Sequence, residues 1–167
     1  MTAMPHRVLP AAPVAGLDAY RASGGGVGLD VARRTDPAAV MGAITEAGLR
    51  GRGGAGFPTG VKWRTVLGAE SDLKFVCCNA DEGDSGTFAD RMLIEGDPFT
   101  LIEGMTIAAY AVGATEGYVY LRSEYPDAVA TLKTAIEIAL ARGWLGSDIL
   151  GSGLTFDLHD LLWRQAS

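Results

Sequence analysis

The stretch that decides the fold is residues 97–122, DPFTLIEGMTIAAYAVGATEGYVYLR. Asp97 followed by Pro98 predicts a helix start, because the carboxylate can cap free amides and the proline has the φ angle of a first helical position. Apolar residues then recur at helical spacing until Gly113, where the helix is predicted to end. Gly117 to Arg122 has the composition of a strand. The stretch therefore predicts a buried helix that leads into a β-strand.

The alternation of helix and strand continues on both sides of this stretch. Upstream, Leu73 to Cys78 (LKFVCC) has the length and the β-forming residues of a strand. Downstream, a helix is predicted from Pro126 to Arg142 and a third strand from Leu154 to His159. Parallel strands need long crossover connections, and helices of this length supply them. The sequence therefore predicts an α/β fold with a right-handed, doubly wound and mostly parallel sheet.

Two shorter helices are predicted before this core. Asp36 and Pro37 repeat the combination of a capping carboxylate and a proline, and Gly48 offers a stop for the helix that they begin. Thr59 is the predicted cap of another helix that runs through Leu67. Both predicted helices precede the first predicted strand.

Length and composition fit one domain. The chain has 167 residues, of which 48% are hydrophobic, and this composition is globular rather than disordered. Residues 1–35 are rich in Pro, Ala and Gly and are predicted to be a loosely ordered lead. Residues 36–159 are predicted to form the N-terminal part of an α/β domain, and residues 160–167 a divergent tail.

Charge and hydropathy exclude several partners. The net charge of −6 leaves no basic surface to neutralise a phosphate backbone, so no nucleic-acid partner is expected. The apolar stretch between Glu103 and Glu116 is shorter than the roughly 18 residues of a membrane span, so no membrane insertion is expected. Cys77 and Cys78 are adjacent and would point to opposite sides of a strand, which makes them poor disulfide partners. A reducing, cytoplasmic compartment fits best.

The strongest local signal is the glycine loop, which we define as residues 51–60, GRGGAGFPTG. Closely spaced glycines let backbone amides approach an anion, and the helix predicted next aims its positive end at the same place. Arg52 and Lys62 would add positive charge beside a phosphate. A solvent-exposed turn is the alternative, but ordinary turns need only one or two glycines. The loop therefore predicts a phosphate or nucleotide site.

Two common nucleotide motifs do not explain this loop. Gly51, Gly53 and Gly56 match the pattern G-x-G-x-x-G, but that fingerprint follows a strand directly, whereas a predicted helix precedes the loop here. A Walker A loop fails because Gly60 is followed by Val61 rather than by lysine. The loop is therefore expected to cradle phosphate in another way.

A second polar cluster follows the first predicted strand, where a parallel sheet binds its ligands. It consists of Asn79, Asp81, Glu82 and Asp84. Carboxylates near a bound nucleotide can accept hydrogen bonds from ribose hydroxyls or ring nitrogens, and they disfavour an added phosphate. A surface turn of the Asx type is the alternative, and a metal site is a third possibility, although the EF-hand pattern is absent.

Other residues carry weaker signals. Phe57, held by Pro58 within the glycine loop, could stack on a nucleotide base or simply pack against its neighbours. His6 and His159 are not spaced as metal ligands, and the two cysteines are interpreted as strand residues rather than as a redox pair. No metal site is predicted.

The two motifs together resemble a known family. Gly51 to Trp63, GRGGAGFPTGVKW, and Asn79 to Arg91, NADEGDSGTFADR, closely resemble the FMN-binding, NADH-oxidising subunit of respiratory complex I. Related subunits occur in NAD-reducing hydrogenases and NAD-linked formate dehydrogenases. The resemblance runs from about Gly48 to His159 and implies a Rossmann-like FMN-binding domain.

This resemblance implies a set of cofactors and residues. Hydride would pass between NADH or NAD and FMN, and electrons would pass to or from iron-sulfur clusters in partner subunits. The implied FMN cradle and its cation are Gly51, Arg52, Gly53, Gly54 and Lys62. The implied polar group that binds FMN is Asn79, Asp81 and Glu82. The positions implied to touch the nicotinamide nucleotide are Phe57 and Asp84.

The sequence also departs from the family. Complex I members usually have Glu-Pro where this chain has Asp84-Ser85, and GDSGTFADR is more similar to the formate dehydrogenase and hydrogenase branch. They also tend to have an aromatic residue at the position of Thr65. After His159 the family continues into a second glycine-rich, acidic segment that is missing here, so we expect a truncated chain without an iron-sulfur cluster of its own. The alternatives to an active subunit are an inactive nucleotide-binding fragment and a docking domain.

Overall fold

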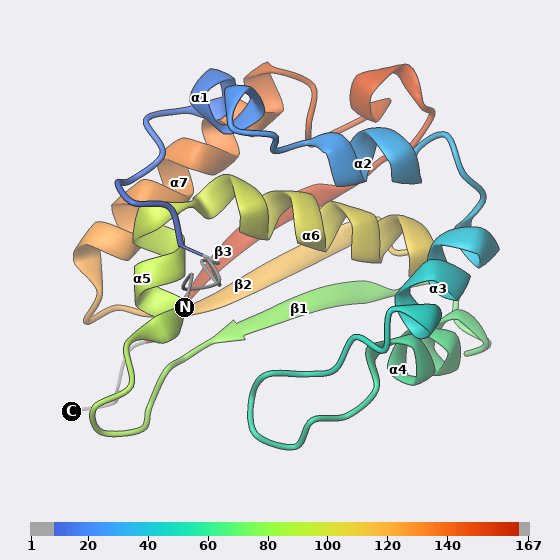
Figure 1. The fold of residues 1–167 in the computed structure, drawn as a ribbon, viewed down its shortest axis with the longest axis horizontal. Helices are drawn as coiled ribbons and strands as arrows, with labels where there is room; N and C mark the ends of the chain where they lie inside the picture. Colours follow the sequence, from blue (N-terminus) through green and yellow to red (C-terminus); the bar gives the residue numbers. More distant parts are fainter. Residues whose placement is uncertain (1–8, 164–167) are drawn as a thin grey trace, which may run out of the picture.

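The computed structural model describes the backbone of residues 9–163 and the side chains of residues 9–161 (Figure 1). The elements that form the sheet and the layer against it are β1 (Phe75–Ala80), α5 (Ala89–Gly96), α6 (Pro98–Val112), β2 (Glu116–Arg122), α7 (Pro126–Ala141) and β3 (Asp157–Trp163). The elements outside them are α1 (Leu17–Ala22), α2 (Val27–Ala32), α3 (Pro37–Glu46), α4 (Thr59–Leu67) and the short 3-10 helix η1 (Ile149–Gly151).

The three strands form one parallel sheet in the order β1-β2-β3. Cys77 lies opposite Tyr118, and Tyr118 lies opposite His159, so the register is continuous across the sheet. Each strand returns to the same end of the sheet through helices, as the sequence predicts for an α/β fold with a parallel sheet. That fold class is confirmed. The succession of strand, helix, strand, helix and strand is the unit from which doubly wound sheets are built.

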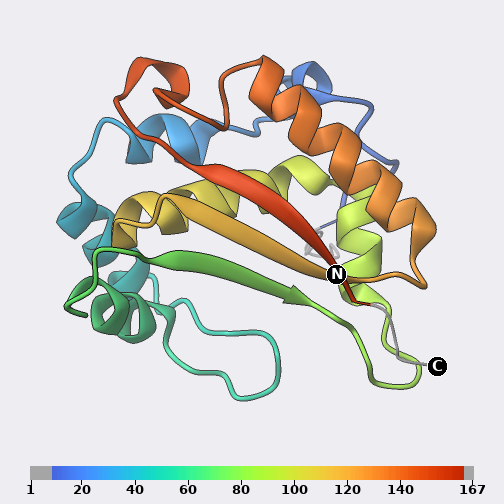
Figure 2. The same cartoon turned by 180° about the vertical axis from the view of Figure 1, so that it is seen from behind.

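Among the described residues, helices cover one face of the sheet and leave the other face open. Along β2, Val119 and Leu121 are fully buried, whereas Tyr118 and Tyr120, which alternate with them, are partly exposed. Both α6 and α7 contact the sheet, and Figure 2 shows no helix over the face that it presents. Side chains therefore alternate between a core face and an open face.

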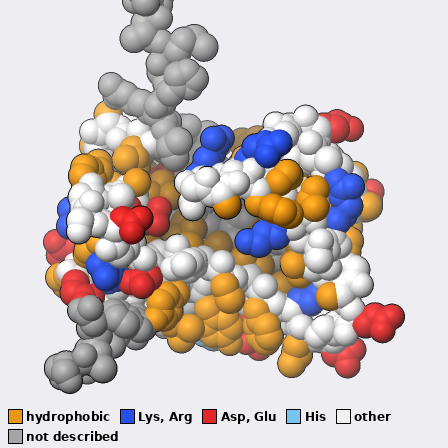
Figure 3. All heavy atoms as spheres, turned by 90° about the horizontal axis from the view of Figure 1, so that it is seen from below, with side chains coloured by type: hydrophobic (Ala, Val, Ile, Leu, Met, Phe, Trp, Pro, Cys, Tyr) orange, Lys and Arg blue, Asp and Glu red, His pale blue; other side chains and the backbone are white. Residues whose placement is uncertain are grey.

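An aromatic row crosses the open face. The rings of Phe75 and Tyr118 have centroids 5.9 Å apart, and those of Tyr118 and His159 are 5.3 Å apart. Figure 3 shows hydrophobic side chains gathered along the lower edge of its view. The aromatic row leaves apolar surface exposed on this face, although parallel sheets are usually covered on both faces.

Helix α6 forms where its caps predict. The Asp97 carboxylate accepts a hydrogen bond from the Thr100 amide at 3.1 Å, and Gly113 ends the helix with a φ of 74°. The helix is apolar on most sides because it is surrounded by other elements. The centre of the core is formed by fully buried residues of α6, β2 and α7 and by Phe156, which directly precedes β3. Those of the three elements include Ile102, Ala109, Val119, Leu121, Leu132 and Ala139.

The predicted lead is ordered from residue 9 onward, so the expectation of loose order is wrong for that part, and residues 1–8 lie outside the described residues. Helices α1 and α2 bury Leu17, Tyr20 and Leu29 in the core. The reason is a long-range contact with Glu103 of α6, which is only 8% exposed. Its carboxylate accepts hydrogen bonds from the amides of Gly26 and Leu29, each at 2.8 Å.

Several element boundaries differ from the prediction. Thr59 is the first residue of α4 rather than its cap, and Pro58 occupies the cap position without a capping side chain. The first strand is shifted toward the acidic turn, and the third runs to Trp163, into the residues expected to be a divergent tail. Helix α5 was not expected, because Ala89 to Gly96 lacks a capping residue at its start. The amides at its start are capped instead by the side chain of Glu82, which lies earlier in the chain.

Candidate functional site

A cavity of about 960 Å³ lies at the carboxyl end of β1, within the range of roughly 300–1,000 Å³ typical of ligand sites. One wall comes from the glycine loop. The other is the segment that runs from the end of β1 into α5. Figure 3, seen from the side on which the glycine loop lies, shows the surface hollowed near its middle. The lining residues are Arg52, Gly53, Gly54, Asn79, Asp81, Glu82, Gly83, Asp84, Gly86, Thr87, Phe88, Ala89 and Asp90.

The glycine loop is closed at its base by main-chain contacts. The Gly51 amide donates to the Phe57 carbonyl at 2.9 Å, and the Thr59 amide donates to the Leu49 carbonyl at 2.9 Å. These bonds belong to an antiparallel bridge between Arg50 and Pro58. The loop therefore leaves and re-enters the fold at one fixed point, and helix α4 begins at once.

The glycine loop needs glycine for its backbone conformation, and it leaves space beside that backbone for a ligand. Gly54 has a φ of 98°, a conformation that L side chains rarely adopt. A Cβ atom at Gly53 or Gly54 would meet no other atom within 4 Å. Neither amide takes part in a hydrogen bond within the described part of the chain. The loop thus presents unpaired N–H donors at the cavity wall, which suits an anionic group.

The turn after β1 is anchored by Arg122 at the end of β2. The Arg122 Nε donates to Asp81 Oδ1 at 2.8 Å, and this ion pair is partly buried. The Asp81 amide in turn donates to the Asn79 side-chain oxygen at 3.1 Å. The turn is therefore of the Asx type that the sequence offered as an alternative, yet it also lines the cavity.

Glu82 links the same turn to α5. Its two carboxylate oxygens accept hydrogen bonds from the amides of Asp90 at 3.2 Å and Arg91 at 3.3 Å. These amides lie in the first turn of the helix, which has no other partners for them and attracts negative charge. Glu82 therefore takes the role of the missing cap of α5. This contact explains a helix that local sequence signals did not predict.

Burial and neighbouring charge alter two groups near the cavity. Partial burial raises the pKa of Asp90 above its usual value, and the Glu82 carboxylate adds to the effect. Burial raises the pKa of the Cys78 thiol to about 11, with smaller contributions from Asp90 and Cys77. Cys78 is thus kept as a neutral thiol, whereas Cys77 is exposed on the open face of the sheet.

The cavity brings together most of the residues that the sequence singled out, namely Arg52, Gly53, Gly54, Asn79, Asp81, Glu82 and Asp84. Gly51, Phe57 and Lys62 are not among its lining residues, although they belong to the same loop and the following helix. Phe57 is 54% exposed. Sequence reasoning missed Thr87, Phe88 and Asp90, which lie within the second motif, and Arg122, whose signal is its place at the carboxyl end of a strand.

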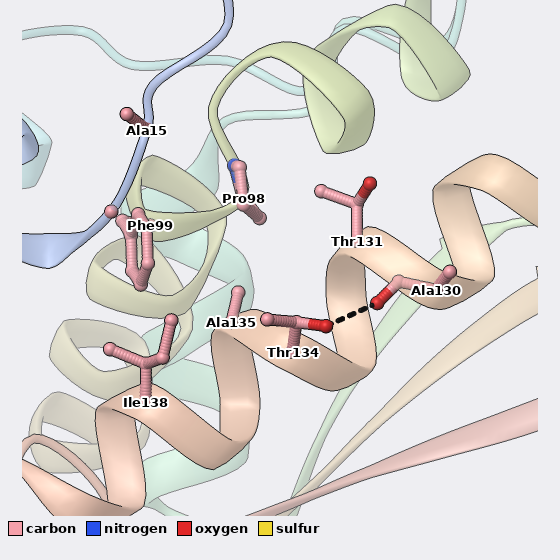
Figure 4. A pocket seen from close by; sticks show the side chains of 9 residues that line it. Ala15, Pro98, Phe99, Ala130, Thr131, Thr134, Ala135 and Ile138 are labelled. Carbon is pink, nitrogen blue, oxygen red and sulfur yellow. Dashed lines mark hydrogen bonds between the residues drawn. The ribbon is translucent and has the colours of Figure 1, made fainter.

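A second, smaller cavity of about 280 Å³ lies between α6 and α7 (Figure 4). Phe99 and Ile138 point toward it in this view. The Thr134 hydroxyl is already used, because it donates to the Ala130 carbonyl at 3.0 Å. The residues that line this cavity include no charged side chain, so it does not match the chemistry of a nucleotide.

Two further observations concern membranes and metals. Among the helices of residues 9–163, none has both the length and the hydropathy needed to cross a bilayer. Across the same residues, His, Cys, Asp and Glu side chains do not gather in groups of three or more that could hold a metal ion.

Comparisons with known proteins agree with the two motifs. Residues 44–161 match the family model described as the Nuo51 FMN-binding domain. The chain is 51% identical over 143 residues to "NADP-reducing hydrogenase subunit HndC" of Solidesulfovibrio fructosivorans, covering 86% of this chain and 29% of that protein. It is 49% identical over 144 residues to an NADH-quinone oxidoreductase subunit of Rhizobium meliloti, covering 86% of this chain and 34% of that protein.

A solved structure agrees as well. The NAD+-reducing [NiFe]-hydrogenase in its H2-reduced state matches with a TM-score of 0.64 and 42% sequence identity, over 77% of this chain and 21% of the hydrogenase chain. The chain spans about a third of the length of the curated relatives described above.

Proposed function

The chain belongs to the family of the Nuo51 FMN-binding domain, and we propose that it binds FMN in the cavity between the glycine loop and the turn after β1. The observation that carries this proposal is the meeting of the two motifs around one cavity, although Gly53 and Asp81 are 28 positions apart in the chain (81 − 53). The residues fit the group. Unpaired amides at Gly53 and Gly54 suit a phosphate, and the carboxylate of Asp81 suits hydroxyl groups.

Each wall would bind a different part of the cofactor. The backbone of Gly51 to Gly54 would hold the phosphate, with Arg52 and Lys62 supplying positive charge. Asn79, Asp81 and Glu82 would accept hydrogen bonds from the ribityl chain and the ring. Phe57 and Asp84 would contact the nicotinamide nucleotide, and the half-exposed ring of Phe57 is available for stacking.

The proposed activity is that of a flavoprotein oxidoreductase subunit. Bound FMN would supply the chemistry by exchanging a hydride with NADH or NAD and passing electrons singly to or from iron-sulfur clusters in partner subunits. The protein's own task would be to orient the two nucleotides and exclude water from the space between them. Both cysteines are free thiols, which agrees with a cytoplasmic location for such a protein.

We further propose the branch of NAD-linked formate dehydrogenases and NAD-reducing hydrogenases, on the basis of GDSGTFADR at residues 83–91, with formate dehydrogenase as the first candidate. The experiment is co-purification of the tagged chain from its own cells, followed by assays of NAD reduction with formate and with hydrogen. Formate-dependent NAD reduction is expected. Reduction that depends on hydrogen instead would assign the chain to the hydrogenase branch and contradict this finer proposal.

The test of FMN binding is a titration of the purified chain, followed by the quenching of flavin fluorescence. Saturable binding at micromolar FMN is expected. Gly54→Val should weaken it at least about tenfold, because a β-branched residue is strained at a φ of 98°. Gly104→Ala in α6 is the matched control, since a Cβ there meets no atom within 4 Å. Wild-type protein that binds no FMN at high micromolar concentration would contradict the proposal.

A nucleotide-binding module without turnover is the second candidate. It is favoured by the position of Phe57 and Lys62, which do not line the cavity. Oxidation of NADH by the FMN-loaded chain, with ferricyanide as the electron acceptor, separates the two. Turnover would exclude the inactive module. FMN binding without any NADH oxidation would support it.

A further inference from the structure

The turn after β1 is held from behind by the next strand. Arg122, the last residue of β2, donates from Nε to Asp81 Oδ1 at 2.8 Å and from Nη1 to the Glu82 carbonyl at 3.3 Å. One guanidinium group thus fixes a side chain and a main-chain oxygen of two consecutive residues. Such paired contacts restrict orientation more than a single bond does.

The Glu82 carbonyl accepts a second hydrogen bond, from the residue that directly precedes α7. The Tyr125 hydroxyl donates to the Glu82 carbonyl at 3.2 Å. The Arg91 guanidinium lies over the Tyr125 ring, 5.4 Å from its centroid. The turn is therefore connected to β2, to α7 and, through the Glu82 carboxylate, to α5. A binding group is most precise when rigid elements support it in this way.

Arg122 does not itself reach the cavity. It is absent from the described residues that line the cavity, whereas Asp81 and Glu82 are present. Within the described residues, Oδ1 is the oxygen of Asp81 that forms side-chain hydrogen bonds, which leaves Oδ2 for a ligand. The contact therefore orients the carboxylate while Arg122 stays behind it.

We propose that Arg122, supported by Tyr125, is a positioning residue that orients the Asp81 carboxylate toward the hydroxyl-bearing and ring portion of a flavin, and not toward its phosphate. This inference rests on the proposed FMN site. The unpaired amides that suit a phosphate belong to the opposite wall, at Gly53 and Gly54. The two walls thus divide the ligand between them.

The experiment compares FMN with riboflavin, which lacks the phosphate, as titrants of the purified chain. Arg122→Gln should weaken the binding of both flavins by about tenfold, because the Asp81 carboxylate is no longer held in place. Arg122→Lys should recover part of the loss, since an ammonium group can pair with Asp81 but cannot bridge to the Glu82 carbonyl at the same time. Tyr125→Phe, which removes one hydroxyl, should weaken both by a smaller factor.

A double-mutant cycle with Asp81→Asn tests whether Arg122 acts through Asp81. The two losses should be clearly less than additive, because Arg122→Gln has little left to misplace once the carboxylate is gone. Arg142→Gln is the matched control. It removes an arginine that donates to Asp18 Oδ1 at 2.6 Å, at a site that shares no residue with the cavity, and it should leave both affinities unchanged.

The outcomes separate this inference from the proposed function. Wild-type protein that binds no FMN overturns both. If wild-type protein binds FMN, the inference alone is overturned by unchanged affinity in Arg122→Gln, by additive losses in the cycle, or by a loss for FMN with none for riboflavin. The last result would mean that Arg122 binds the phosphate. Thermal unfolding of each variant shows whether a loss is local, and Tyr125→Phe provides the comparison if Arg122→Gln does not fold.

Discussion

At the scale of single residues, Cys77 and Cys78 show how adjacent side chains acquire different chemistry. They lie on opposite faces of β1, so Cys77 is exposed on the open face while Cys78 packs against the core. Burial raises the pKa of the Cys78 thiol to about 11, so only about one molecule in a thousand carries the thiolate there at pH 8.

We therefore expect iodoacetamide at pH 8 to modify Cys77 first, with Cys78 reacting far more slowly. Both cysteines lie in the tryptic peptide 75–91, so fragmentation of this peptide in the mass spectrometer over time would measure the two rates. Cys77→Ser should abolish the fast modification, and Cys78→Ser should leave it intact. Fast modification that survives in Cys77→Ser would contradict the assignment of the two faces.

Asp90 predicts a dependence of stability on pH. Its raised pKa means that the folded state disfavours the ionised form, although the residue lies in the first turn of α5. The wild-type chain therefore loses stability as pH rises through that pKa, and asparagine does not titrate. We expect Asp90→Asn to be more stable at pH 7, by less than about 1 kcal/mol because the side chain is largely exposed.

Urea unfolding of Asp90→Asn and wild-type protein at pH 7 and pH 3 measures this effect. The advantage of the variant should shrink as pH falls below the ordinary carboxyl pKa of 3.8, since Asp90 is then protonated in both states. An advantage that is larger at pH 3 than at pH 7 would have the wrong sign.

Most residues that line the cavity could be predicted from the sequence, because they belong to two continuous motifs. Arg122 could not, since its hydrogen bond to Asp81 spans 41 positions and depends on the pairing of β1 with β2. The capping of α5 by Glu82 was missed for another reason, because Glu82 lies eight and nine positions before the amides that it caps, farther than a usual capping side chain. Local patterns report contacts between near neighbours in the chain, and neither of these contacts is of that kind.

At the scale of elements, Asp36 and α3 follow local rules closely. The Asp36 carboxylate accepts hydrogen bonds from the amides of Ala38 at 2.9 Å and Ala39 at 3.0 Å. We expect Asp36→Ala to lower the free energy of unfolding by about 1 kcal/mol, measured by urea denaturation, and Asp36→Asn to have little effect because asparagine also caps. Equal losses in both variants would point to a role for the charge instead.

The contact between α3 and α4 depends on the absence of a side chain at Gly60. A Cβ there would lie 2.3 Å from Thr45 Oγ1 and 3.1 Å from Thr45 Cα, and the latter atom is backbone. We expect Gly60→Ala to destabilise the chain by about 1–3 kcal/mol, although alanine favours helix by about 1 kcal/mol. Thermal unfolding measures this loss of stability. Gly42→Ala in α3 is the control, because a Cβ atom there would meet no atom within 4 Å.

Long helices were easier to predict than short ones. Helices α6 and α7 carry proline at their start, glycine after their end and apolar residues throughout. Helices α1 and α2 have six residues each and no capping side chain. They are too short for their apolar residues to show a helical spacing. Their order comes from packing against α6, which no local pattern contains.

At the scale of the whole molecule, the buried Glu103 joins the N-terminal helices to the core. Glu103→Ala would leave the amides of Gly26 and Leu29 without their acceptor in the interior, which should cost at least about 3 kcal/mol of stability. Tyr20→Phe, which removes one donor to the same carboxylate, should cost only about 1 kcal/mol.

Hydrogen exchange resolves whether this loss is local. We expect faster exchange over residues 17–32 in Glu103→Ala, with a much smaller change in β2 and α7. A uniform increase across the sheet would instead mean that Glu103 supports the core itself. Urea denaturation of both variants gives the stabilities to compare.

The same contact has a consequence for the order of synthesis. Gly26 and Leu29 precede Glu103 by 77 and 74 positions, so α2, and α1 before it, emerge from the ribosome well before the carboxylate that accepts the hydrogen bonds of these two amides. At roughly 5–20 residues per second, that interval is about 4–15 seconds. During it the carboxylate that accepts these hydrogen bonds is missing, so α1 and α2 cannot reach their native position before Glu103 has emerged.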